Sequence, residues 1–285
     1  MRLLPWRVVV AIGAAAGAMV YRLGVRRRVV LANLARAFPE WTASERRRVA
    51  RQTYRNVGRT MIECLVLDTL SPDKMNQLVE QGKDTGFLGQ LLAARKPFIV
   101  ATGHLGNWEL IGSYFARQGY PLKVFAKALH NPRLESVLLS TRRSLGFDVI
   151  YTGEGLKPAL RHLREGGVLA LVADQDARRA GVAIPFFGVP ASTALGPAVF
   201  AYLARVPIVP VFAIRVGTMR HSCIVCPPIE PPVGEKREVV LEWLTRAHVA
   251  ALEAAVRQYP EQYFWFHRRW KTPVEKLARQ PAKAE

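Results

Sequence analysis

The stretch that most constrains the fold of this chain is residues 98–110. An apolar run that favours β-structure is followed by Gly103, His104 and, after one more residue, Gly106, and then by a segment with helical spacing. This pattern predicts a strand, a tight turn and the start of a helix. Reactive side chains are often held at such a junction, because the strand is rigid and the first helical amides lack internal partners.

His104 and Glu109 are the candidate catalytic residues of this stretch. Within one regular helix a spacing of five residues would place them about 140° apart around the axis. They can meet if His104 precedes the helix, and Gly103 and Gly106 permit the necessary bend. A histidine oriented by a carboxylate is a general base, whose nucleophile here would be a hydroxyl of the substrate. The alternative is a core histidine next to a first-turn acid that the helix dipole favours.

Metal ligands do not follow from the sequence. A zinc site of the His-Glu-x-x-His kind needs a second histidine one helical turn away, and none lies near His104. Cys223 and Cys226 resemble half a zinc site, but on a strand their thiols would point to opposite faces. With Cys64 they make three cysteines, which cannot all pair, so a reducing compartment is expected. We predict no metal and no cofactor.

The charge of the chain requires an anionic partner. Its 285 residues contain 41 Lys and Arg against 22 Asp and Glu, a net charge of +19. Nucleic acid, an acidic membrane or an acidic protein would each satisfy this charge. A nucleic-acid binder would not account for the hydrophobic N-terminus or the His-Glu turn, so we predict no nucleic acid. No linker divides the chain, and we expect residues 1–21 as an anchor, 22–273 as one domain and 274–285 as a tail.

The N-terminal segment indicates a membrane anchor or an interfacial helix. Residues 8–21 carry no charge and are followed by an arginine cluster. A span needs about 20 apolar residues, so this run is short unless it extends back through Arg7 and tilts. A cleaved signal peptide is the rival, because residues 14–18 offer small side chains. The arginines that follow favour a retained anchor.

A basic helix is predicted after Pro39. Thr42 and Glu45 form a capping box. An apolar stripe then recurs every four residues, at Val49, Thr53, Val57, Met61 and Leu65, with six arginines mostly off it, at Arg46, Arg47, Arg48, Arg51, Arg55 and Arg59. This basic face is either solvated or lies on anionic lipid, and the neighbouring hydrophobic N-terminus favours lipid.

From Gly119 onward, short apolar runs alternate with helical patterns, which is typical of an α/β fold. Strands are expected at residues 122–126, 148–151 and 168–173, with helices at 132–145 and near 155–164. A charged loop with Asp174 and Asp176 follows the most apolar strand, where ligands usually bind. The prolines of residues 206–214 suggest an edge strand or the beginning of a strand. Interleaved aromatic and basic residues at 263–271 suggest a surface for nucleic acid or a membrane interface.

Several of these motifs together resemble one family, the lipid A lauroyl/myristoyl acyltransferases of the wider glycerophosphate and lysophospholipid acyltransferase superfamily. The likeness runs from about Arg22 to Pro273. It is carried in order by His104-Leu105-Gly106-Asn107-Trp108-Glu109, Asp174-Gln175-Asp176, Pro185-Phe186-Phe187-Gly188 with Pro190-Ala191-Ser192-Thr193, Val206-Pro207-Ile208-Val209-Pro210-Val211, and residues 261–271.

This resemblance implies a glycerol-3-phosphate acyltransferase-like fold: one α/β domain with a mixed, mostly parallel sheet flanked by helices, plus an N-terminal anchor helix. It also implies an enzyme of lipopolysaccharide biosynthesis on the cytoplasmic face of the bacterial inner membrane. Such an enzyme moves a fatty acyl group from acyl carrier protein, or from coenzyme A, to a hydroxyl of a saccharolipid precursor of lipid A. The catalytic dyad would be His104 and Glu109. Asp174-Gln175-Asp176 replaces the Glu-Gly-Thr-Arg-like phosphate motif of the glycerophosphate branch, which favours the lipid A branch.

The remaining site predictions follow from this chemistry. His104 would take the proton of the acceptor hydroxyl while Glu109 holds its other ring nitrogen. Backbone amides of Gly106, Asn107 and Trp108 are the candidate oxyanion donors. Arg142, Asp174, Asp176, Arg178 and Arg179 are candidate substrate-binding residues, and Phe186 and Phe187 candidates for the acyl pocket. A hydrolase, or transfer to another glycolipid or lysophospholipid, stays open because a fold does not encode its acceptor.

Overall fold

The computed structural model describes residues 5–67, 77–81, 86–218, 220–273, 275 and 277. Its centre is a seven-stranded sheet with the order β1-β9-β8-β2-β5-β3-β4, in which the β8–β9 pair is antiparallel and the other pairs are parallel. The predicted single α/β domain with a mostly parallel mixed sheet is confirmed. The strands are β1 (Val79–Gln81), β2 (Phe98–Thr102), β3 (Leu122–Ala126), β4 (Asp148–Tyr151), β5 (Val168–Val172), β6 (Val182–Phe186), β7 (Val189–Thr193), β8 (Ile208–Gly217) and β9 (Arg220–Val225).

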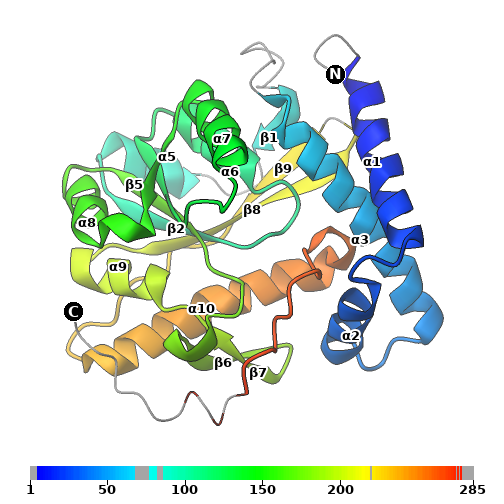
Figure 1. Cartoon of the computed structure of the whole chain (residues 1–285). Coiled ribbons are helices and arrows are strands. Elements are labelled where there is room, and N and C mark those ends of the chain that lie inside the picture. Colours follow the sequence, from blue (N-terminus) through cyan, green and yellow to red (C-terminus); the bar gives the residue numbers. More distant parts are fainter. Residues whose placement is uncertain are drawn as a thin grey trace.

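Helices cover both faces of this sheet (Figure 1). They are α1 (Trp6–Arg22), α2 (Arg27–Ala37), α3 (Ala43–Cys64), α5 (Gly86–Ala93), α6 (Glu109–Arg117), α7 (Pro132–Ser144), α8 (Lys157–Arg164), α9 (Gly196–Ala204) and α10 (Arg237–Gln258), with short 3-10 turns η2 (Thr152–Glu154), η3 (Arg178–Ala180) and η4 (Pro260–Gln262). Alternate residues of β2 face opposite cores. Phe98 and Val100 pack with α6, and Ile99 and Ala101 pack with α8, α9 and α10. Burial on both sides explains why β2 reads as a continuous apolar run.

Helix α1 packs against α3 through glycines. A Cβ atom on Gly17 would lie 2.0 Å from the Tyr54 carbonyl oxygen, and one on Gly58 would lie 2.1 Å from the Gly13 carbonyl oxygen. The two backbones therefore approach more closely than larger side chains would allow. One face of α1 is buried, including Val9.

The predicted N-terminal anchor does not form one straight membrane-spanning helix in the part of the chain that is described. Among the described residues, no single helix is long and apolar enough to cross a membrane. Helices α1 and α2 together have the length and apolar composition of a membrane span, but the chain bends by 92° between them. Residues 1–4, which the predicted anchor includes, and most of the predicted tail at 274–285 lie outside the described residues.

The capping box of Thr42 and Glu45 at the start of α3 is confirmed, but the predicted apolar stripe is only partly correct. Val49 and Thr53 are buried, whereas Met61 and Leu65 are exposed. A step of four residues turns about 400° and so drifts about 40° per step around a straight helix. The buried face instead continues through Tyr54, Thr60 and Glu63.

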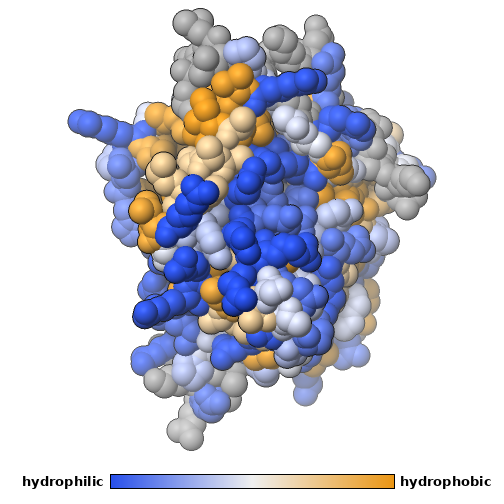
Figure 2. Space-filling view, turned by 90° about the vertical axis from the view of Figure 1, so that its right-hand side faces the viewer, coloured by the Kyte–Doolittle hydropathy of each residue, from blue (hydrophilic) through white to orange (hydrophobic). Residues whose placement is uncertain are grey.

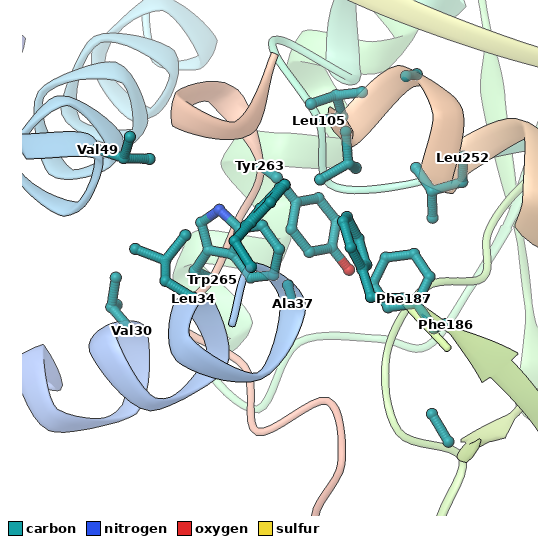
Figure 3. Packing of buried hydrophobic residues seen from close by; sticks show 14 of the residues in the cluster. Val30, Leu34, Ala37, Val49, Leu105, Phe186, Phe187, Leu252, Tyr263 and Trp265 are labelled. Carbon is teal, nitrogen blue, oxygen red and sulfur yellow. The ribbon is translucent and has the colours of Figure 1, made fainter. Parts of the chain in front are cut away.

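The segment after α10 packs largely inside the molecule, although Arg268 and Lys271 are exposed. Tyr263 and Trp265 are buried and pack with Phe186 and Phe187 of the β6–β7 hairpin and with residues of α2, as Figure 3 shows. Arg269 is also buried and binds the Ser192 carbonyl oxygen and the Thr193 hydroxyl. The aromatic and basic pattern at 263–271 is therefore largely internal packing.

Pro207 stands directly before strand β8. This confirms the beginning of a strand, one of the two alternatives predicted from the prolines at 206–214. Strand β8 is internal, between β9 and β2. Pro207 precedes it, and Pro210 ends the register with β2 just before pairing with β9 begins at Val211. A residue without an N–H is tolerated there because Pro210 faces the side of β9 and stands just before the ladder with β9 begins at Val211.

Candidate active site

His104 and Asp174 meet because β2 and β5 are neighbours in register. Thr102 pairs with Val172, and each site residue stands two positions beyond its strand. The His104 Nδ1 atom lies 2.6 Å from Asp174 Oδ1, and the His104 backbone N–H donates to Asp174 Oδ2 at 2.9 Å. Both oxygens of one buried carboxylate therefore fix the histidine.

This pairing corrects the predicted partner of the histidine. Among the described residues, the hydrogen bond to the His104 ring comes from Asp174, and none joins the ring to Glu109. The Nε2 atom has no hydrogen-bond partner in the described part of the chain, and the His104 side chain is 22% exposed. The ring thus keeps one nitrogen free to meet an incoming group.

The electrostatics of the pair stabilise positive charge on the ring. Burial acts to lower the pKa of His104, but the charge and hydrogen bond of Asp174, with a smaller contribution from Glu109, outweigh it and raise the pKa. Burial acts to raise the pKa of Asp174, but His104 and, to a smaller extent, Arg269 outweigh it and lower the pKa. Asp174 is therefore an ionised carboxylate that stabilises positive charge on the ring.

Glu109 is the first residue of α6, so the prediction that His104 precedes the helix is confirmed. Its carboxylate binds Arg142 of α7, with Oε1 2.8 Å from Nη2 and Oε2 3.0 Å from Nε. Burial acts to lower the pKa of Arg142, and the hydrogen bond and charge of Glu109 more than offset this and raise it. The planar guanidinium matches the two carboxylate oxygens, which explains why Glu109 is engaged by Arg142 and not by the ring. The predicted substrate residue Arg142 is thereby held beside the turn.

Two of the three predicted oxyanion donors are already occupied. The Gly106 amide donates to the Gln262 carbonyl oxygen at 3.0 Å, and the Asn107 amide donates to the Ala213 carbonyl oxygen at 2.9 Å. The Trp108 amide has no hydrogen-bond partner among the described residues. Gly106 has φ +63°, and a Cβ atom there would lie 1.9 Å from the Ala213 oxygen, so the turn requires glycine.

A buried carboxylate behind the turn was not predicted. Glu63 of α3 is fully buried, and its two oxygens lie 2.5 and 2.6 Å from the two Nη atoms of Arg215. The Asn107 side chain donates to the same carboxylate at 2.8 Å, and the Thr60 hydroxyl donates to the Gly106 carbonyl oxygen at 3.0 Å. An acidic residue on the buried face of a helix is the sequence signal that could have found Glu63.

The other polar predictions lie around the pair without joining it. The Asp176 amide donates to His267 Nε2 at 2.9 Å, and its carboxylate accepts from the Thr272 hydroxyl at 2.9 Å. Arg178 and Arg179 are exposed on η3. Neither forms an ion pair with any described residue. Their predicted role in substrate binding stays a prediction.

The two phenylalanines of the predicted acyl pocket are core residues. Phe186 is fully buried, and Phe187 packs against Phe38 and Trp265 with ring centroids 5.0 and 6.0 Å apart. An acyl chain would reach them only if these aromatic contacts opened (Figure 3).

The potential metal ligands are dispersed. Within the described ranges, no three His, Cys, Asp or Glu side chains are placed to hold a metal ion. Cys223 is buried, and burial raises its pKa to about 12. Burial also raises the pKa of Cys226. Both are therefore neutral thiols near pH 7.

The site is a histidine that a buried carboxylate fixes beside the start of a helix in an α/β domain, an arrangement suited to general-base catalysis. The chain belongs to the bacterial lipid A biosynthesis acyltransferases, whose family profile matches residues 1–272.

Individual relatives are 24–29% identical to the chain over the aligned residues. A lipid A biosynthesis lauroyltransferase of Escherichia coli is 25% identical over 276 residues, 95% of this chain and 88% of the relative. A lipid A biosynthesis myristoyltransferase of the same organism is 24% identical over 86% of this chain and 75% of the relative. A phosphatidylinositol mannoside acyltransferase of Mycobacterium tuberculosis is 29% identical over 54% of this chain and 50% of the relative.

Proposed function

We propose that the chain transfers a fatty acyl group from a thioester, carried by acyl carrier protein or coenzyme A, to a hydroxyl of a lipid A precursor. The observation that carries this proposal is the His104–Asp174 pair, which leaves Nε2 free while Asp174 binds Nδ1 at 2.6 Å. The family and the E. coli relatives support lipid A as the acceptor class.

In the proposed reaction His104 Nε2 takes the proton of the acceptor hydroxyl as its oxygen attacks the thioester carbonyl carbon. Asp174 holds the other ring nitrogen and stabilises the imidazolium. The Trp108 amide donates to the oxyanion of the tetrahedral intermediate, a contribution of about 3 kcal/mol for such donors in other enzymes. When the C–S bond breaks, the leaving sulfur takes the proton from His104, and the ester and a free thiol result.

Glu109 and Arg142 act as one unit in this proposal. Their two hydrogen bonds hold a guanidinium next to the turn, where it binds an anionic or carbonyl oxygen of a substrate. Glu109 also contributes to the positive shift of the His104 pKa. The Glu109–Arg142 ion pair therefore positions the substrate and also stabilises the positive charge that forms on His104.

Comparison of His104→Ala with the wild type tests this function. Mass spectrometry of membrane lipids from cells with and without each form should show one lipid class that lacks an acyl group when His104 is replaced. We expect a loss of about 10²–10⁴-fold in transfer, the usual contribution of a general base. Circular dichroism checks the fold. Release of free fatty acid in place of an acylated lipid would indicate a hydrolase and refute transfer.

A mannosylated phospholipid is the second candidate acceptor. The phosphatidylinositol mannoside acyltransferase of M. tuberculosis is 29% identical over 160 residues of this chain, a segment of comparable similarity to that shared with the lipid A enzymes. The same lipid analysis separates the candidates, because the acceptor that loses its acyl group is identified by its sugar.

We further propose that α1 binds the cytoplasmic face of the bacterial inner membrane. Opposite the buried face of α1, Val8, Ile12 and Met19 are exposed, and Leu23 after it is 72% exposed. Figure 2 shows the side of the molecule on which α1 lies, where hydrophobic residues gather next to a broad hydrophilic region. An apolar helix face beside basic residues suits the surface of an anionic membrane.

Point variants test this attachment better than deletion, because α1 also buries Val9 and its glycines against α3. Met19→Glu with Leu23→Glu should weaken flotation with anionic vesicles. The matched control is Val233→Glu with Val239→Glu, which adds the same charge at positions that are 97% and 50% exposed and lie far along the chain from α1. Equal binding of all three proteins would refute the proposed contact.

A further inference from the structure

A cavity of about 570 Å³ lies between α3, the end of β8 and η4. Arginine and amide side chains dominate its wall, namely Arg55, Arg59, Arg215, Asn56 and Gln262, with Glu261 as a carboxylate. The volume lies in the range of pockets that hold small molecules. This cavity, named here the α3 pocket, is separate from His104 and Asp174.

The arginines of the α3 pocket differ in how their charges are compensated. Arg215 is neutralised by Glu63 through two hydrogen bonds. Arg59 binds the neutral Asn56 side chain at 2.9 Å, and neither Arg59 nor Arg55 forms an ion pair with any described residue, Glu261 included. Two guanidinium groups therefore face one cavity without a counter-ion from the described chain.

This arrangement is unfavourable in the empty pocket. Arg55 and Arg59 are four residues apart on α3, a spacing at which like charges repel. Burial lowers the pKa of Arg59, and the positive charges of Arg215 and Arg55 lower it further, against a smaller opposite effect of the Glu63 carboxylate. An anion between the two guanidinium groups would remove this repulsion, so the pocket is built to favour an anionic ligand.

The shape of the donors favours phosphate. Each guanidinium presents a planar fork of N–H groups that binds two oxygens of a phosphate at once. A second hollow on α3, lined by Ser44, Arg47, Arg48, Arg51, Gln52 and Arg55, shares Gln52 and Arg55 with the α3 pocket. The hollow carries further positive charge up to the pocket and steers anions towards it.

We propose that the α3 pocket binds a phosphate monoester, which under the proposed function is borne by the sugar of the acceptor. The pocket also contacts the catalytic turn from behind. The Gln262 side chain exchanges two hydrogen bonds with the Arg215 backbone, at 2.8 and 2.9 Å, and the Gln262 carbonyl oxygen accepts from the Gly106 amide at 3.0 Å. A phosphorylated glycolipid anchored here is held at a fixed place relative to the turn that carries His104. The sugar and the role in acyl transfer rest on the proposed function, whereas binding of the phosphate does not.

The test measures binding to the purified full chain, by isothermal titration and by ³¹P NMR, with glucosamine 1-phosphate, inorganic phosphate and a soluble short-chain phosphatidic acid. We expect saturable binding of the sugar phosphate. Arg55→Gln with Arg59→Gln should weaken it at least ten-fold. The matched control is Arg161→Gln with Arg164→Gln, which removes the same charge from two exposed positions of α8, outside both the pocket and the hollow, and should change affinity less than three-fold.

The outcomes separate the possible explanations. Equal weakening by both double variants would mean a general charge effect and would overturn the pocket. Preference for phosphatidic acid would assign the site to a phospholipid, and preference for inorganic phosphate would assign it to the free ion; either refutes a sugar phosphate. His104→Ala should bind the sugar phosphate like the wild type while transferring no acyl group. If that variant binds normally but the wild type also transfers nothing, the proposed function fails and the pocket stands.

Discussion

Asp174→Asn is the sharpest test of the site. The asparagine side chain has nearly the same shape, but its amide cannot accept from both the His104 ring and the His104 backbone N–H, as the carboxylate does at 2.6 and 2.9 Å. One hydrogen bond and the negative charge are therefore lost together. Hydrogen bonds to charged groups contribute about 1.5–3 kcal/mol each.

The loss should be largest in the transition state, when His104 becomes an imidazolium. A charge pair about 4 Å apart near a protein surface interacts with about 4 kcal/mol. A deficit of about 3–5 kcal/mol corresponds to about 10²–10⁴-fold in kcat. Binding of substrate should change less, because the charge on the ring forms after binding.

The pH dependence provides a second readout. Asp174 raises the pKa of His104 against the effect of burial, and a general base works only when it is unprotonated. In the wild type the rate therefore rises with pH through this raised value. Without the carboxylate burial dominates, the pKa falls, and the acid limb of kcat/KM moves to lower pH.

Steady-state transfer over a pH series, with circular dichroism of each protein, measures both effects. Asp176→Asn is the matched control, because it removes the same charge two residues away, where the carboxylate accepts from Thr272. Its acid limb should stay where that of the wild type lies. Retention of more than a tenth of wild-type turnover by Asp174→Asn, or an unmoved acid limb, would refute the assignment of Asp174 as the residue that fixes the base.

Further predictions concern the support of the site and the stability of the fold. Glu109→Gln and Arg142→Gln should each reduce transfer, and the double variant should be scarcely slower than the worse single one, since the two side chains bind each other; multiplicative losses in a double-mutant cycle would contradict this. Gly106→Ala should destabilise the fold by about 3 kcal/mol or more, because φ is +63° and the Ala213 oxygen blocks the added carbon; a melting temperature equal to that of the wild type would exclude it. His221 and His248 are buried, and burial lowers the pKa of each to about 4. In the unfolded chain these two histidines take up protons near pH 6.5, whereas in the folded chain they do so only near pH 4. The free energy of unfolding is therefore full above pH 6.5 and falls by on the order of 3 kcal/mol per histidine as pH decreases towards 4. Denaturant unfolding at pH 7 and pH 5 should show a smaller difference in this free energy when both histidines are replaced by glutamine. Activity should survive EDTA and phenanthroline, and a loss that zinc restores would overturn the mechanism without a metal.

Local sequence determined the frame of the site. The run at 98–102 forms β2, the glycines around His104 form the turn, and Glu109 begins α6, because each of these features depends on neighbours within a few residues. The alternation after Gly119 likewise predicted strands β3, β4 and β5 at nearly their observed bounds. Such features follow from backbone preference and from the period of apolar residues.

Tertiary structure decided which side chains meet. His104 and Asp174 are 70 positions apart, and each stands two residues beyond its strand. Only the order of strands in the sheet, with β2 beside β5, brings these two ends together, and no local pattern encodes that order. The same applies to Glu109, which a five-residue spacing allowed to reach His104 but which the neighbouring α7 engages through Arg142. Glu63 was not predicted, because the buried face of α3 does not follow a strict four-residue repeat. Glu63 lies on this buried face, where it binds Arg215 and Asn107 from distant parts of the chain. Sequence by itself thus specifies the elements and the reactive residue types, while the packing of elements distant in the chain selects their partners.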